Sequence, residues 1–181
     1  MTLETGRPAS GENRQPRELR TYDFLDDLKI PYQRVDHAPA GTMEDCALVD
    51  QALGTAMCKN LFLCNRQETA FYLLMMPGGK KFRTKDLSAQ IGSSRLSFAN
   101  EQHMLELLDI QPGAVSVLGL VNDREHRVQL LVDRELLSQP MIGCHPCVNT
   151  SSLCLAQKDL WEKILPATGH DYRVVELPAV E

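Results

Sequence analysis

Residues 60–76 read NLFLCNRQETAFYLLMM, and this stretch contains the clearest fold signal in the sequence. Two apolar runs, 60–65 and 70–76, flank the polar segment RQE, which is the pattern of two strands joined by a turn. The tripeptide PGG at 77–79 then interrupts the second run, because proline cannot donate to a sheet ladder and glycine favours turns. The stretch therefore predicts a β-hairpin.

Helical periodicity predicts amphipathic helices on both sides of this hairpin. Leu19, Tyr22 and Leu25 recur at helical spacing near the N-terminus, so that one helix face can be buried. Capping residues and glycine stops support several of the helices further along the chain. The expected helices cover residues 17–29, 43–53, 84–91, 101–108 and 157–165.

Strands are expected between and after these helices. The apolar runs 115–121 and 128–132 flank the polar turn 122–125, which indicates a second hairpin, whereas 141–148 reads as a loop. Helices and strands alternate without the regular rhythm of a doubly wound parallel sheet. The sequence thus predicts an α/β protein of the α+β type, with a mixed, largely antiparallel sheet and packed helices. The other expected strands are 32–35, 94–98, 151–155 and 172–177.

Composition limits the classes of protein to which the chain can belong. It has 181 residues, 43% of them hydrophobic, and a formal net charge of −5, which favours one globular domain over 17–181 after a disordered polar tail at 1–16. The acidic balance argues against duplex DNA as a partner. The longest apolar run has about six residues and the N-terminus lacks the apolar core of a secretory signal, so we expect no membrane span and a cytoplasmic protein.

Cys144 and Cys147 form a C-x-x-C pair, one of the patterns used by redox and zinc proteins. The residues after it, 148–152, are poor helix formers, whereas a thioredoxin-like pair precedes a helix. A second pair of zinc ligands at the usual spacing is missing from the sequence. Two incidental thiols in a turn are therefore the favoured interpretation, and redox use remains an alternative.

Two further features could form a polar site. Lys59 precedes the apolar run of the first hairpin, where a lysine is costly unless it faces a polar cleft or reaches solvent. The turn from Gly143 to Pro146 combines a flexible glycine, the titratable His145 and a rigid proline.

The segment 80–85 carries four cations in six residues, which fits either a solvated loop or contact with RNA.

Several motifs occur together in one order, and this order is more specific than any single motif. The chain resembles the YbaK/aminoacyl-tRNA synthetase-associated family of prolyl-tRNA editing domains, over roughly residues 18–178. Within this family it is similar to the free-standing, PrdX-like Ala-tRNA(Pro) deacylases. The motifs are CKNLFL at 58–63, KDL at 85–87, RLSFA at 95–99, PGAVS at 112–116, LVND at 120–123 and GCHPCVNT at 143–150.

The resemblance implies a mixed domain around a curved sheet that hydrolyses the ester of mischarged Ala-tRNA(Pro) to alanine and tRNA(Pro). Water is expected to attack with help from a ribose hydroxyl, without a cofactor or metal ion. A pocket too small for proline would select alanine, because a site shaped for proline cannot strongly reject a smaller side chain. The resemblance implies catalytic roles for Lys59, Asn60, Gly143 and His145, and substrate contacts by Cys144, Pro146 and Asn149.

The implied partner is the acceptor end of mischarged tRNA(Pro), with prolyl-tRNA synthetase as a further partner. Because tRNA is a polyanion, the cations of the segment 80–85 are expected to contact it. Cys-tRNA(Pro) is an alternative substrate, and a non-catalytic module that binds tRNA or the synthetase is an alternative function. The expected tRNA-binding residues are Lys80, Lys81, Arg83 and Lys85.

Overall fold

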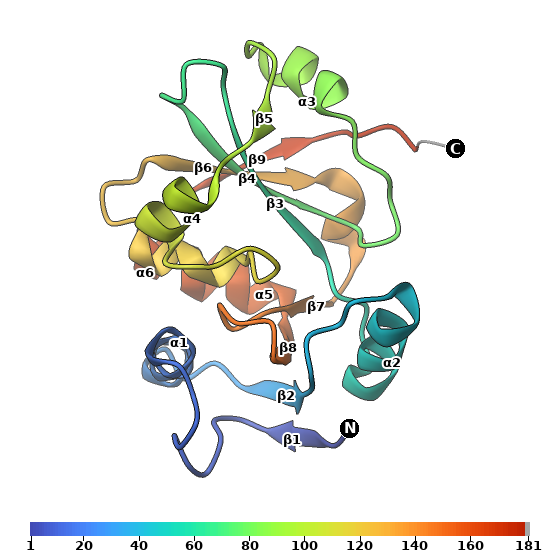
Figure 1. Cartoon of the computed structure of the whole chain (residues 1–181), viewed down its shortest axis with the longest axis vertical. Coiled ribbons are helices and arrows are strands. Elements are labelled where there is room, and N and C mark those ends of the chain that lie inside the picture. The colour runs from blue at the N-terminus through green and yellow to red at the C-terminus, as the bar shows by residue number, and fades with distance from the viewer. Residues whose placement is uncertain (180–181) are drawn as a thin grey trace.

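Two β-sheets share one apolar core in the computed structural model, which describes residues 1–179 (Figure 1). The smaller sheet is antiparallel throughout, and the larger one combines antiparallel and parallel strands. The smaller sheet has the order β1 (Leu3–Thr5), β2 (Tyr32–Asp36), β8 (Ser151–Ala156), β7 (Met141–Cys144). The larger sheet has the order β5 (Ser97–Phe98), β3 (Lys59–Cys64), β4 (Phe71–Met76), β6 (Val128–Asp133), β9 (Tyr172–Val175).

Helices cover both sheets. Within residues 1–179, none of them is long and apolar enough to cross a membrane. The α-helices are α1 (Pro16–Asp27), α2 (Met43–Leu53), α3 (Thr84–Ile91) and α4 (Glu101–Leu108). Two 3₁₀ helices cover Val117–Asn122 and Arg134–Ser138, and a C-terminal helix combines α5 (Gln157–Asp159), a π-helical turn (Leu160–Ile164) and α6 (Leu165–Thr168).

The predicted hairpin is confirmed as β3 and β4, which pair in antiparallel register with Leu61 opposite Leu74. Side chains on its two faces enter different cores, because neighbours along a strand point to opposite sides. Phe62 faces the core between the sheets, whereas Leu63 faces a second core beneath α3. The hairpin therefore links the two halves of the hydrophobic interior.

Local capping chemistry explains why the predicted helices form. Thr42 and Asp45 make a reciprocal capping box at the start of α2, and Gly54 ends that helix in the left-handed conformation with φ 79°. Asn100 caps α4 by accepting a hydrogen bond from the backbone N–H of His103. The expected mixed α/β architecture with packed helices is thus confirmed.

The second predicted hairpin is wrong. Residues 117–122 form a 3₁₀ helix, and β6 pairs in parallel with β4 and β9 instead. The 3₁₀ helix is buried on nearly all sides, and an apolar run of that kind has no period that separates helix from strand. Residues 141–144, expected as loop, form β7.

The N-terminal segment 1–16 also differs from the expected disordered tail. Its residues 3–5 extend the smaller sheet by pairing with β2. Arg14 donates to Glu18 at 2.8 Å and to Asp36 at 3.0 Å, so the segment is held by backbone pairing and charge. These interactions need no apolar side chains, which is why composition alone suggested disorder.

Candidate active site

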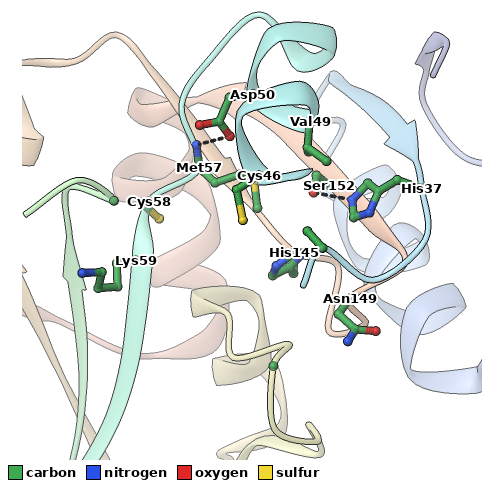
Figure 2. Close-up of a pocket in the computed structure, with 13 residues that line it drawn as sticks. His37, Cys46, Val49, Asp50, Met57, Cys58, Lys59, His145, Asn149 and Ser152 are labelled. Carbon is green, nitrogen blue, oxygen red and sulfur yellow. Dashed lines mark hydrogen bonds between the residues drawn. The ribbon is translucent and has the colours of Figure 1, made fainter. Parts of the chain in front are cut away.

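A cavity of about 390 Å³ opens where α2, the start of β3 and the loop after β7 meet (Figure 2). This volume lies within the usual range for small-molecule sites. Polar and apolar side chains from segments far apart in the sequence line it together. The lining residues are His37, Ala40, Cys46, Val49, Asp50, Met57, Cys58, Lys59, Gly78, Gly113, His145, Asn149 and Ser152.

His145 is held as a neutral imidazole with a defined tautomer. Its Nδ1 lies 3.0 Å from the carbonyl oxygen of Ser151, and because a carbonyl only accepts, Nδ1 carries the proton. Burial lowers the pKa of His145 and outweighs the opposing effect of the hydrogen bond to the Ser151 carbonyl. The ring atom Nε2 therefore keeps its lone pair at neutral pH and can accept a proton.

His37 forms the neighbouring part of the same wall, with its ring centroid 6.5 Å from that of His145. Its Nδ1 donates to the carbonyl of Ala38, and its Nε2 accepts from the hydroxyl of Ser152, each at 2.8 Å. No motif in the sequence singled out His37 as a site residue. Its role depends on the pairing of β2 with β8, a contact between residues more than a hundred positions apart.

Asp50 supplies the one carboxylate among the residues that line the cavity within 1–179. It lies on the face of α2 that also presents Cys46 and Val49 to the cavity. Burial raises the pKa of Asp50, although a hydrogen bond from the backbone N–H of Met57 at 3.2 Å opposes that effect. No sequence signal singled out Asp50, because helical spacing alone does not show which face meets a cavity.

Lys59 reaches the cavity at its edge. Its ammonium donates to the carbonyl oxygen of Lys80 at 2.6 Å, and Figure 2 shows it turned away from the two histidines. Asn149, also predicted from the sequence, lies in the wall beside Gly113. The structure thus brings Lys59, His145 and Asn149 together around one cavity.

The other predicted site residues lie outside the cavity lining. Asn60 points to the opposite face of β3 from Lys59, where its amide donates to the sulfur of Cys58 at 3.1 Å and its carbonyl oxygen is buried without a partner among the described residues. Cys144 and Pro146 are buried. They support the loop that carries His145.

Gly143 has a packing role that the sequence did not suggest. Its carbonyl accepts from the backbone N–H of Cys58 at 3.0 Å. A Cβ at this position would lie 2.9 Å from the carbonyl oxygen of Ala56, closer than real Cβ contacts allow. Only glycine lets β7 approach the segment 56–58, which leads into β3.

The thiols do not form a reactive pair. All six cysteines are free, and burial raises the pKa of Cys147 to about 11 and that of Cys144 well above its ordinary value. Because the thiolate is the reactive form, these buried thiols are inert at neutral pH. Residues 1–179 also contain no group of three or more metal-ligating side chains.

The four predicted RNA-binding cations divide into two kinds. Lys80 is a correction, because its side chain is only about 10% exposed and its ammonium pairs with Asp133 at 2.7 Å and Glu135 at 2.9 Å. Burial opposes its charge, but these hydrogen bonds outweigh burial and raise the pKa of Lys80. The remaining three, Lys81, Arg83 and Lys85, are exposed.

Comparisons with known proteins agree with this geometry. A family model described as the aminoacyl-tRNA editing domain matches residues 37–163, which include every residue that lines the cavity. The prolyl-tRNA editing protein ProX of Acetoanaerobium sticklandii is 35% identical over 153 residues, which cover 84% of this chain and 93% of that protein. The prolyl-tRNA synthetase associated domain-containing protein 1 of Danio rerio is 30% identical over 172 residues, which cover 93% and 92% of the two chains.

The fold also has solved counterparts. A crystal structure described as that of a candidate trans-editing enzyme for prolyl-tRNA synthetase superposes with a TM-score of 0.67 at 18% identity, covering 91% of this chain and 99% of that one. At this identity the likeness concerns the fold alone. Because the family model spans well over half of the sequence, the chain belongs to the aminoacyl-tRNA editing domain family.

Proposed function

We propose that this protein is a trans-acting aminoacyl-tRNA deacylase, and that its substrate is alanine esterified to tRNA(Pro). The observation that carries the proposal is a partly buried, neutral His145 that lines the cavity and whose Nε2 is not used in a hydrogen bond within residues 1–179. A proton acceptor in such a place suits ester hydrolysis by water. Membership of the editing family and the names of its prolyl-tRNA relatives support tRNA(Pro) as the tRNA, and the resemblance to Ala-tRNA(Pro) deacylases supports alanine as the amino acid.

In the proposed reaction, water attacks the carbonyl carbon of the aminoacyl ester and the bond to the ribose oxygen breaks. Nε2 of His145 accepts a proton from the attacking water, directly or through the free ribose hydroxyl, and the departing ribose oxygen takes a proton in return. The neutral tautomer cannot donate to the oxyanion, because its single N–H is bound to Ser151. His145 thus serves as a base.

Charged groups at the cavity fit the two ends of this substrate. The carboxylate of Asp50 is suited to the α-ammonium group of the aminoacyl moiety, which needs a counter-charge once it leaves water. The ammonium of Lys59 uses one of its three N–H groups in the hydrogen bond to the Lys80 carbonyl. The other two N–H groups are suited to a ribose or phosphate oxygen. The proposal also requires that the part of the cavity that receives the side chain admit alanine and exclude the larger proline.

The test is hydrolysis of Ala-tRNA(Pro), Pro-tRNA(Pro) and Ala-tRNA(Ala) by the wild type and by Lys59→Ala and His145→Ala. We expect selective loss of alanine from tRNA(Pro), and a fall of about 10²–10⁴-fold in the His145 variant if it acts as the base. Unchanged hydrolysis after Lys59→Ala would remove that residue from the mechanism.

A result without hydrolysis of these three substrates would redirect the proposal. Cys-tRNA(Pro) would then be tested as the second substrate. Failure there as well would favour the binding-module alternative, in which the chain holds tRNA or prolyl-tRNA synthetase without chemistry. Dissociation constants for uncharged tRNA(Pro) and for the synthetase would then show which partner it binds.

A further inference from the structure

A hollow of about 730 Å³ lies at the start of α3 and shares no lining residue with the active-site cavity. Phe82, Arg83, Lys85 and Arg95 contribute to its lining. Phe98 on β5 packs against Phe82, with ring centroids 6.3 Å apart and ring planes at 69°. We call these five residues the basic–aromatic patch.

Phe98 is the unusual member of this patch. Its side chain is 60% exposed, although it lies on a strand of two residues at the edge of the larger sheet. Phe82 is partly buried against the core beneath α3 and supports the Phe98 ring from the side. An exposed ring held in this way offers a flat apolar surface for another planar group.

The charges around the ring are positive in a chain whose net charge is −5. Arg83 pairs with Asp86 at 2.8 Å, whereas Lys85 and Arg95 have no carboxylate partner among residues 1–179. Cations beside an exposed aromatic ring are the combination by which proteins hold single-stranded nucleic acid, since bases stack on the ring and phosphates meet the cations.

The position of the patch relative to the cavity fits one continuous ligand. Phe98 pairs with Leu63, which lies on the same face of β3 as Lys59 and four residues further along. At about 3.3 Å per residue this places the patch about 13 Å from Lys59 along the strand. That distance equals roughly four nucleotides at a stacked rise of about 3.4 Å.

We propose that the basic–aromatic patch binds an unpaired base near the 3′ end of the tRNA, stacked on Phe98, with the adjoining phosphates held by Arg83, Lys85 and Arg95. This inference rests on the proposed function. It extends the binding surface from the aminoacyl group in the cavity to bases upstream of the terminal adenosine. It also gives the exposed Phe98 a role that packing does not.

Two substrates distinguish the patch from the cavity. Ala-tRNA(Pro) reaches both, whereas the alanyl ester of adenosine reaches only the cavity. Phe98→Ala should lower kcat/KM on Ala-tRNA(Pro) roughly 5- to 150-fold, the range expected for one stacked base, and leave hydrolysis of alanyl-adenosine unchanged. Phe98→Trp keeps a ring and should retain most activity, and Leu105→Ala, which removes another exposed apolar side chain, serves as the control.

Binding of uncharged tRNA(Pro) tests the patch without any need for catalysis. If the wild type hydrolyses neither ester, the proposed function fails, but weaker binding of uncharged tRNA(Pro) by Phe98→Ala would still support the patch. Equal binding of uncharged tRNA(Pro) by the wild type and Phe98→Ala would overturn it. If Phe98→Ala weakened binding to prolyl-tRNA synthetase but not to tRNA(Pro), the patch would be assigned to a protein partner. That result would also overturn the proposal.

Discussion

At the scale of single residues, His145 should determine how the activity depends on pH. The neutral ring is the working form, and burial favours it, so that the pKa of His145 lies below its ordinary value near 6.5. The midpoint of the acid limb of the pH–rate profile should therefore lie below 6.5. Activity should be lost as the pH falls through the pKa of His145. Measuring kcat/KM against pH checks this prediction, and an acid limb above 6.5 would contradict a neutral His145 base.

Asp50 should decide whether the substrate needs a free α-amino group. Wild-type protein should hydrolyse Ala-tRNA(Pro) faster than lactyl-tRNA(Pro), which carries a hydroxyl in place of the ammonium. Asp50→Asn should reduce this preference by about tenfold or more, because hydrogen bonds to charged groups contribute about 1.5–3 kcal/mol. The two rates measured side by side give the ratio, and a ratio unchanged by the substitution would assign Asp50 to structure alone.

Sequence reasoning found part of this site. Lys59, His145 and Asn149 could be predicted from the sequence, because each lies within a motif that resembles the editing family. His37 and Asp50 could not be predicted, because the pairing of β2 with β8 and the packing of α2 bring them to the cavity. Motifs identify residues that carry chemistry, whereas the neighbours that tune them are fixed by tertiary contacts.

At the scale of elements, the N-terminal segment supports the loop that orients His145. Arg14 pairs with Asp36, Asp36 accepts from the hydroxyl of Ser151 at 2.7 Å, and the carbonyl of Ser151 binds His145. Burial alone would raise the pKa of Asp36, but hydrogen bonds from Arg14 and Ser151 outweigh burial and hold it well below its usual range. A segment expected to be disordered is therefore connected to the base.

Replacing Arg14 should therefore lower the stability of the fold. Arg14→Met should lower the free energy of unfolding by about 1–3 kcal/mol, less than for a fully buried pair because this one is partly exposed. Urea unfolding measures the change. Arg7→Met removes a more exposed pair with Asp23 and should cost about 1 kcal/mol or less. Equal losses in the two variants would mean that the Arg14 network adds nothing specific.

The fold divides into parts that local signals predict and parts that they do not. The β3–β4 hairpin and the four capped or periodic helices α1 to α4 follow from alternation, spacing and turn residues. The 3₁₀ helix at 117–122 and the parallel pairing of β6 do not, because a fully buried apolar run fits either conformation. Partner choice among strands is a property of the assembled core.

At the scale of the whole molecule, an acidic protein must bind a polyanion through a local surface. Each phosphate neutralised on single-stranded RNA contributes about −0.7 to the slope of log K against log salt concentration. Replacing Arg83, Lys85 and Arg95 together by Gln should therefore flatten the slope for tRNA(Pro) by about 2 and weaken binding. Lys80 is left intact, because its ammonium is already paired inside the fold.

A matched control separates this local effect from net charge. Replacing Lys29, Lys158 and Lys163 by Gln also removes three positive charges, but from other parts of the surface. Lys29 lies just after α1, Lys158 lies in α5 and Lys163 lies in the π-helical turn. If the basic–aromatic patch holds the RNA backbone, only the first triple variant changes the salt slope, and fluorescence titration at several salt concentrations measures it. Equal flattening by both triple variants would mean that tRNA responds to the overall field of the protein, and the path from the cavity to Phe98 would lose its electrostatic support.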